Sequence, residues 1–178
     1  ASSKQESLGH KEITPKDRTE LMYSFVQTLA QLHSIDWTAI PELQNDFSDV
    51  NKKSQYETYY ERQINTWTRQ YRASETGRNE PMEKLIEWLP NHIPADSISK
   101  QTCITHGDYK IDNVVFHPTE NRVIAVLDWE LSTIGNGIGD LAFNCMFYHF
   151  PSFGNLGGLA GEDLEEKGIP SEQEIVTK

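Results

Sequence analysis

One stretch of this sequence decides the fold, and it reads His106-Gly107-Asp108-Tyr109-Lys110-Ile111-Asp112-Asn113. Asp128 follows Asn113 by fifteen residues and ends an apolar run, Val123-Ile124-Ala125-Val126-Leu127. This pattern places two Asp side chains and an Asn near strand ends, with a Lys between the first Asp and the Asn. Phosphoryl transfer needs such a set, because a carboxylate orients the attacking hydroxyl and oxygen ligands hold Mg²⁺ on the phosphates.

Each residue of this set has a chemical role and a structural alternative. Asp108 is the expected catalytic residue, which takes the proton of the acceptor hydroxyl; a capped Gly-Asp turn is the alternative. Asn113 and Asp128 are the expected Mg²⁺ ligands, since this ion takes oxygen ligands and keeps several waters. A turn Asn and a strand-end cap are their alternatives. Lys110 is also assigned to the catalytic set, where it neutralises charge on the phosphate, and a solvated lysine is the alternative.

Three motifs in order resemble those of the aminoglycoside phosphotransferase and choline kinase family, whose members are small-molecule kinases related to protein kinases. His106-Gly107-Asp108 with Asn113 is similar to the family's catalytic loop, and protein kinases carry His-Arg-Asp with Asn at the same offset. Val126-Leu127-Asp128-Trp129-Glu130 resembles the family's metal-binding strand end, and Gly139-Asp140-Leu141-Ala142 resembles the motif that follows it. The resemblance implies that His106 orients the loop and that a buried Asp140 accepts hydrogen bonds from loop N–H groups.

Two further segments resemble the branch of this family found as the phosphotransferase-like domain of acyl-CoA dehydrogenase family members 10 and 11. They are Leu29-Ala30-Gln31-Leu32-His33-Ser34-Ile35-Asp36 and Tyr60-Glu61-Arg62-Gln63-Ile64, the latter followed by Trp67. The resemblance therefore covers most of the chain, from about Ile13 to about Phe150. It implies Mg²⁺, ATP as co-substrate and a small-molecule hydroxyl acceptor, for which a hydroxyacyl compound is one candidate. Fusion to an acyl-CoA dehydrogenase domain in a parent protein is a further implication.

Outside the motifs the pattern is mainly helical. Thr14 and Pro15 are suited to cap and open a helix that ends near His33, and Pro81 opens another whose apolar side chains are expected to face inward. An aromatic stripe from Tyr56 to Tyr71 indicates a helix between them, for which we favour a core position over a wall of an acceptor pocket. A hairpin of short strands carries the motif loop.

The expected fold class is α+β: the mainly helical C-terminal lobe of a protein-kinase-like fold, with a small β-hairpin carrying the catalytic motifs. Residues 1–12 are polar and are predicted to be a linker or disordered. Residues 13–178 are predicted to be a partial phosphotransferase lobe, truncated at both ends. No strand, glycine-rich loop and second strand precede Thr14, so the N-terminal lobe is expected to be absent and the nucleotide-binding residues stay unknown. We therefore expect little activity from this fragment alone.

Composition excludes some partners. The 16 basic and 27 acidic residues give a net charge of −11, which argues against a nucleic-acid surface. No apolar run approaches the roughly 20 residues of a membrane helix. Cys103 and Cys145 form no zinc pattern and are compatible with a reducing compartment, so an intracellular location is expected, whether cytoplasmic, mitochondrial or peroxisomal. A disulfide between them is possible but has no support in the sequence.

Two other functions compete with a kinase. The chain could be a catalytically inactive kinase-like module that binds or regulates, in which case the missing N-terminal lobe would be natural. It could also be a metal-dependent hydrolase that uses His106, Asp108 and Asp128, although the additional His ligands of such sites are absent. The retained motif residues favour the phosphotransferase.

Overall fold

The structure, a computed structural model, describes residues 13–46, 59–93, 102–152 and 157–178. The predicted linker at residues 1–12 lies outside this part of the chain, and so does Tyr56. The chain forms two compact units. The first unit comprises Ala1–Gln31, Asp108–Asp128 and Leu141–Lys178, and the second comprises Leu32–Gly107 and Trp129–Asp140.

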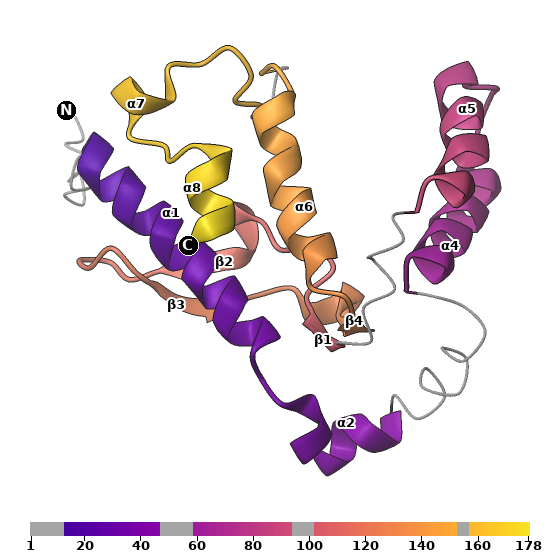
Figure 1. The fold of residues 1–178 in the computed structure, drawn as a ribbon, viewed down its shortest axis with the longest axis horizontal. Helices are drawn as coiled ribbons and strands as arrows, with labels where there is room; N and C mark the ends of the chain where they lie inside the picture. The colour runs from indigo at the N-terminus through magenta and orange to yellow at the C-terminus, as the bar shows by residue number, and fades with distance from the viewer. Residues whose placement is uncertain (1–12, 47–58, 94–101, 153–156) are drawn as a thin grey trace, which may run out of the picture. The chain divides into compact units, whose positions relative to one another are not determined.

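The first unit is built around one long helix and one hairpin (Figure 1). Its elements are α1 (Pro15–His33), β2 (Val114–Phe116), β3 (Val123–Val126), α6 (Ile138–Met146), α7 (Leu164–Lys167) and α8 (Glu172–Thr177), with 3₁₀ turns at Ile111–Asn113 and Phe147–His149; the last turn of α1 and the first of α6 belong to the second unit. Strands β2 and β3 pair antiparallel, as predicted. The backbone N–H of Val123 donates to Ser24 Oγ over 2.9 Å, which holds the hairpin against α1.

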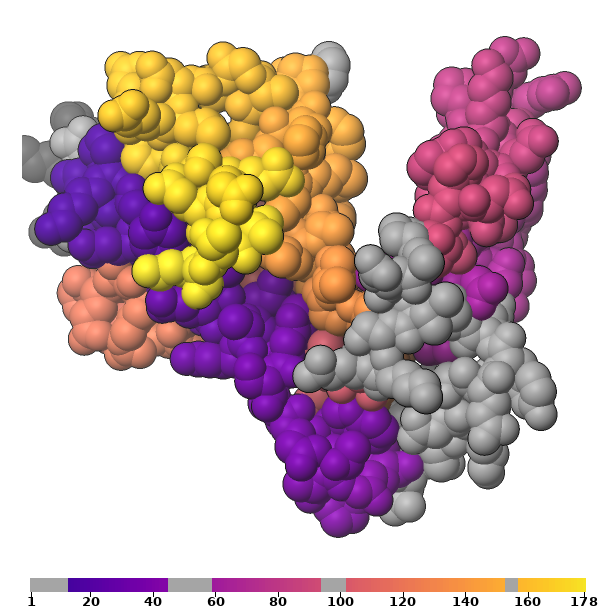
Figure 2. All heavy atoms as spheres, viewed as in Figure 1, coloured from indigo at the N-terminus to yellow at the C-terminus, as the bar shows by residue number. Residues whose placement is uncertain are grey.

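Local sequence explains where the terminal helices of this unit begin. Thr14 Oγ1 accepts from the N–H of Asp17, and Pro15 is the first helical residue of α1, as predicted. Ser171 and Glu174 form the capping box at α8. In the space-filling view α8 lies against α1 and α6 (Figure 2). The core between these elements contains Phe25, Val26, Leu29, Tyr109, Val114 and Ile175.

The second unit combines short helices with one pair of strands. Its elements are α2 (Pro41–Asp46), α4 (Tyr59–Ser74), α5 (Glu80–Trp88), β1 (Cys103–Thr105) and β4 (Thr133–Gly135), with 3₁₀ turns at Trp37–Ala39, Leu89–Asn91 and Trp129–Leu131. Asn79 caps α5 by accepting from the N–H of Met82. Among its described residues, the buried apolar side chains are Leu32, Trp37, Cys103 and Ile134.

The sheet arrangement corrects the single predicted hairpin. Strand β1 pairs antiparallel with β4, which follows Asp128 in the chain, and so forms a second pair of strands apart from the β2–β3 hairpin. Gly135 is therefore the last residue of a strand and pairs with Cys103. Three-residue strands carry too little alternation to predict, and the two partners lie about thirty residues apart in the chain.

The predicted burial of α4 and α5 is wrong. No described residue of either helix is buried, and Trp67 and Leu85 are 49% and 43% exposed. Helical spacing indicates which side chains share a face, but another element must cover that face before it becomes a core. Trp67, Leu85 and Trp88 are therefore exposed apolar side chains on these two helices.

Both cysteines are free thiols. Burial raises the pKa of Cys103 and of Cys145, so each is less ionised than an exposed cysteine at neutral pH. Within the described ranges, no helix has the length and hydropathy needed to cross a membrane.

Candidate active site

Asp108, Lys110 and Asn113 form a hydrogen-bonded cluster in the first unit. Oδ2 of Asp108 accepts from Nζ of Lys110 over 2.7 Å and from Nδ2 of Asn113 over 3.0 Å. Nδ2 of Asn113 also donates to the backbone carbonyl of Asp108 over 2.9 Å. The side chains of Asp108 and Lys110 are 23% and 36% exposed. The cluster is therefore ordered by its own contacts while its carboxylate stays within reach of a bound molecule.

The loop takes this shape because the residue between Asp108 and Lys110 points into the core. Tyr109 is fully buried, its ring stacks on Phe25 with centroids 4.5 Å apart, and its hydroxyl donates to the Phe25 carbonyl over 2.8 Å. Asn144 of α6 donates to the Tyr109 carbonyl over 2.8 Å. With Tyr109 anchored from two helices, its two charged neighbours lie on the outer side of an extended backbone.

The end of β3 brings Asp128 to the same loop. The N–H of Leu127 donates to the carbonyl of Asn113 over 2.8 Å. Leu127 directly precedes Asp128, so this hydrogen bond links the backbone at the two predicted ligand positions. Asp128 has φ of 65°, and no other described non-glycine residue has a positive φ. A left-handed Asp costs conformational energy, and such residues are concentrated at functional sites.

Charge around Lys110 is strongly negative. Its hydrogen bond to Asp108 raises the pKa of Lys110, and the nearby carboxylates of Asp112 and Asp128 raise it further. Lys110 is therefore a persistent cation at neutral pH. Asp112 and Glu130, which the sequence left open between outer charges and solvated residues, are both exposed.

Asp140 forms a separate, buried brace in the second unit. Its Oδ2 accepts from the backbone N–H of His106 and its Oδ1 from that of Gly107, each over 2.8 Å. His33 Nε2 lies 3.0 Å from Oδ2. Burial raises the pKa of Asp140, but the hydrogen bonds from His33, His106 and Gly107 outweigh it and leave this pKa below its usual range. The brace therefore fixes the backbone of the two residues that precede Asp108 in the chain.

Two glycines make room for this brace. Gly107 has φ of 84°, and a Cβ there would lie 2.5 Å from the carbonyl oxygen of Leu131. A Cβ at Gly137 would lie 2.5 Å from Nδ1 of His33. His106 is fully buried with its ring 4.9 Å from that of Trp129, which suits the loop-orienting role expected for it.

The oxygen donors present suit Mg²⁺ bound together with phosphates. Both hydrogens of Asn113 Nδ2 are donated to Asp108, so the amide presents Oδ1 as its acceptor. Asp128 adds an exposed carboxylate at the adjoining strand end. In the described part of the chain no three His, Cys, Asp or Glu side chains group as metal ligands. A two-ligand oxygen set fits an ion that keeps waters and takes its other ligands from a nucleotide.

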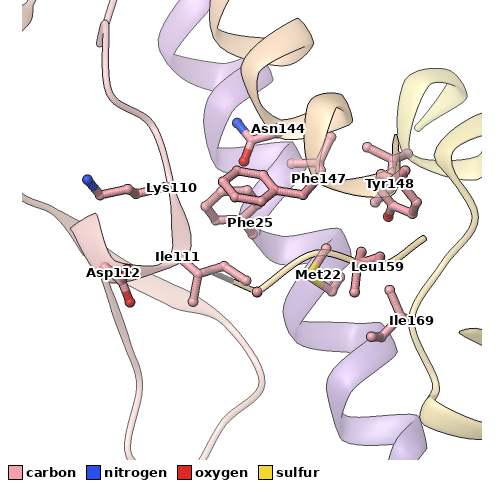
Figure 3. Close-up of a pocket in the computed structure, with 13 residues that line it drawn as sticks. Met22, Phe25, Lys110, Ile111, Asp112, Asn144, Phe147, Tyr148, Leu159 and Ile169 are labelled. Atoms are coloured by element: carbon pink, nitrogen blue, oxygen red, sulfur yellow. The ribbon is translucent and has the colours of Figure 1, made fainter. Parts of the chain in front are cut away.

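A cavity of about 360 Å³ adjoins the Asp108–Asn113 loop within the first unit (Figure 3). Lys110, Ile111 and Asp112 form its loop side, and Figure 3 shows the polar ends of Lys110 and Asp112 directed away from the apolar cluster. The rest of the lining is Met22, Phe25, Val26, Asn144, Phe147, Tyr148, Gly157, Leu159, Ile169 and Ile175. The cavity therefore has a mainly apolar interior with polar groups near the loop.

Sequence reasoning missed three residues that shape this region, namely His33, Tyr109 and Asn144. No local pattern links His33 to Asp140, which lies 107 residues further along the chain. Tyr109 could have been found from the alternation of charged, aromatic and charged residues across Asp108–Lys110. Asn144 is polar among the apolar residues of α6, which is a weaker signal.

Comparison with known proteins gives consistent matches. The model of the phosphotransferase enzyme family matches residues 4–170. Acyl-CoA dehydrogenase family member 10 of Mus musculus is 39% identical over 163 residues, which are 91% of this chain and 14% of that protein. Acyl-CoA dehydrogenase family member 11 of Homo sapiens is 41% identical over 165 residues, which are 93% of this chain and 20% of that protein.

A solved structure from Ralstonia eutropha, provisionally described as an aminoglycoside phosphotransferase, is also similar. It is 41% identical, superposes with a TM-score of 0.76, and matches 91% of this chain and 46% of its own chain. The chain thus spans a fifth or less of these two relatives and under half of the solved chain.

Proposed function

This chain belongs to the phosphotransferase enzyme family, and from that premise we propose that it carries the catalytic loop for transfer of the γ-phosphate of ATP to a small-molecule hydroxyl. The observation that carries the proposal is the cluster of Asp108, Lys110 and Asn113 beside the left-handed Asp128. It combines a carboxylate, a fixed cation and two metal-type oxygen donors within one loop and one strand end.

Asp108 is the proposed base. As the acceptor oxygen bonds to the γ-phosphorus, the bond from phosphorus to the bridging oxygen of the nucleotide breaks and ADP leaves. The acceptor proton moves to the carboxylate of Asp108 late in this transfer. Lys110 and Asn113 support the role because their hydrogen bonds to Oδ2 hold the carboxylate in one orientation.

Lys110 is proposed to neutralise charge on the phosphate. Its raised pKa keeps the ammonium charged, and its side chain is more exposed than that of its partner Asp108. The ammonium can therefore move from the carboxylate to a phosphate oxygen while remaining close to both. Asn113 and Asp128 would hold Mg²⁺, which when bound supplies positive charge to the phosphate oxygens.

The acceptor is proposed to be a hydroxyacyl compound. The cavity beside the loop supports this proposal, because its interior consists mainly of aliphatic and aromatic side chains. An aliphatic chain gains free energy by leaving water for such a surface, whereas a polycationic amino sugar would need acidic partners there. Asp112 is the one acidic residue among the described lining residues, and its carboxylate is directed away from the apolar interior (Figure 3).

The test is Mg²⁺-ATP consumption by the full-length protein with hydroxyacyl and amino-sugar acceptors, comparing Asp108→Asn with Asp112→Asn. Asp112 is the matched control, since it is an exposed carboxylate of the same loop. We expect acceptor-stimulated turnover that disappears in Asp108→Asn and persists in Asp112→Asn. ATP binding without turnover across the panel would favour an inactive binding module, and no ATP binding would overturn the kinase.

A further inference from the structure

Tyr59, the first residue of α4, lies in a notch made by two glycines of the second unit. A Cβ at Gly135 would lie 2.6 Å from Cδ2 and 3.0 Å from Cζ of the Tyr59 ring, and closer still to Cε2. A Cβ at Gly139 would lie 3.5 Å from Cε1, an ordinary van der Waals distance. Neither glycine has a positive φ, so the requirement at Gly135 is space for the ring and not backbone conformation.

The same ring reaches the strand that enters the catalytic loop. The hydroxyl of Tyr59 hydrogen-bonds to the side chain of Thr105, which is fully buried and donates to the carbonyl of Thr133 over 3.0 Å. Burial raises the pKa of Tyr59, and the Asp140 carboxylate adds to the rise. Tyr59 thus contacts β1, β4 and the start of α6, the elements that carry Thr105, Thr133 and Asp140.

Thr105, the partner of Tyr59, leads directly into the loop that Asp140 braces. His106 and Gly107 directly follow Thr105, and their N–H groups are the ones that Asp140 binds.

We propose that Tyr59 is a positioning residue for the transfer reaction: its ring, seated against Gly135, holds β1 and the first turn of α6 in the register that lets Asp140 bind the N–H groups of His106 and Gly107. This role rests on the proposed function of Asp108, which it serves through the backbone and without touching substrate. The proposal also gives a role to Tyr59, one residue of the aromatic stripe, which the catalytic motifs leave unexplained.

The experiment displaces the ring without altering it. Gly135→Ala places a methyl group where the ring lies, and Gly139→Ala is the matched control because its methyl group fits at contact distance. Amide hydrogen exchange at His106 and Gly107 is measured in the full-length protein without substrates, with the Leu127 amide of the first unit as internal reference. Turnover and KM for ATP are then measured on the same proteins.

We expect Gly135→Ala to speed exchange at His106 and Gly107 about tenfold, to leave Leu127 unchanged, and to lower kcat about tenfold with KM for ATP within twofold. Gly139→Ala should resemble the wild type in every measurement. If Gly135→Ala does not fold, Tyr59→Leu removes the ring from the notch, and the same changes in exchange and kcat are expected. Tyr59→Phe keeps the ring and is the control for that variant. Unchanged exchange, or faster exchange with unchanged kcat, overturns the proposal. The exchange result stands even if no acceptor is turned over, so failure of the kinase assignment is distinguishable from failure of this one.

Discussion

Asp108 in the first unit and Asp140 in the second unit are both carboxylates of the motif region, yet their surroundings differ. The side chain of Asp108 is 23% exposed and pairs with Lys110, which is itself partly exposed. The side chain of Asp140 is 3% exposed and accepts from two backbone N–H groups, with His33 beside it. A side chain that binds a substrate needs solvent access. A side chain that fixes the backbone benefits from burial, because its hydrogen bonds are stronger where water does not compete for them.

This comparison predicts that activity and stability will separate between the two carboxylates. Asp108→Asn should lower kcat by about 10³-fold, since it removes the proposed general base, while the unfolding midpoint changes little. Steady-state turnover and thermal unfolding of the same preparation measure both quantities. A similar loss of activity in Asp112→Asn would show that negative charge near the loop matters and not the carboxylate of Asp108 in particular.

Asp140→Ala should give the opposite result and is the largest expected effect on stability. It leaves the N–H groups of His106 and Gly107 and the ring of His33 without their acceptor in a buried place, which costs about 3 kcal/mol of unfolding free energy. Urea denaturation measures this loss of unfolding free energy. Asp112→Ala is the control on an exposed carboxylate and should stay within about 0.5 kcal/mol. Equal effects of the two substitutions would contradict the distinction between the sites.

The acid side of the stability profile sharpens the same comparison. The pKa of Asp140 is lower in the folded chain than its unfolded value of about 3.9. A depressed carboxyl pKa contributes stability that is present above the unfolded value and is lost as the pH falls through the folded one. The unfolding free energy of wild type should therefore exceed that of Asp140→Asn at neutral pH, and the difference should shrink below about pH 4. A difference that is constant down to the acid transition would contradict this assignment.

The sequence was sufficient to predict the cluster of Asp108, Lys110 and Asn113 because these residues lie close together in the chain. Asp108, Lys110 and Asn113 lie within six positions, so the loop that joins them also brings them together. Their spacing and residue types therefore indicated the cluster that the structure contains. The capped start of α1 at Thr14, the β2–β3 hairpin and the capping box of α8 were predictable for the same reason.

The parts that could not be predicted depend on pairing between distant segments. Nothing near His33 in the chain indicates that it meets Asp140, and nothing near Tyr59 indicates that it needs Gly135. Strands β1 and β4 are each too short to show a period, so their pairing was also invisible. The prediction that α4 and α5 are buried was wrong for a related reason. Amphipathic spacing does not reveal whether another element covers the apolar face.

The smallest expected effect concerns how the first unit holds its loop. Tyr109→Phe removes the hydrogen bond to the Phe25 carbonyl but keeps the ring stacked on Phe25, so it should cost about 1 kcal/mol and change kcat by less than about threefold. Tyr71→Phe, at a partly exposed position of α4, is the control and should be near neutral. Urea denaturation measures the change in unfolding free energy, and turnover measures the change in kcat.

The expectation for Tyr109→Phe follows from the contrast between the units. A loop anchored by packing keeps its geometry when one hydroxyl is lost, whereas the brace around Asp140 is made of hydrogen bonds and has no ring to replace them. A loss of activity in Tyr109→Phe as large as in Gly135→Ala would show that hydrogen bonding positions the loop in both units, and the contrast would then be one of solvent access alone.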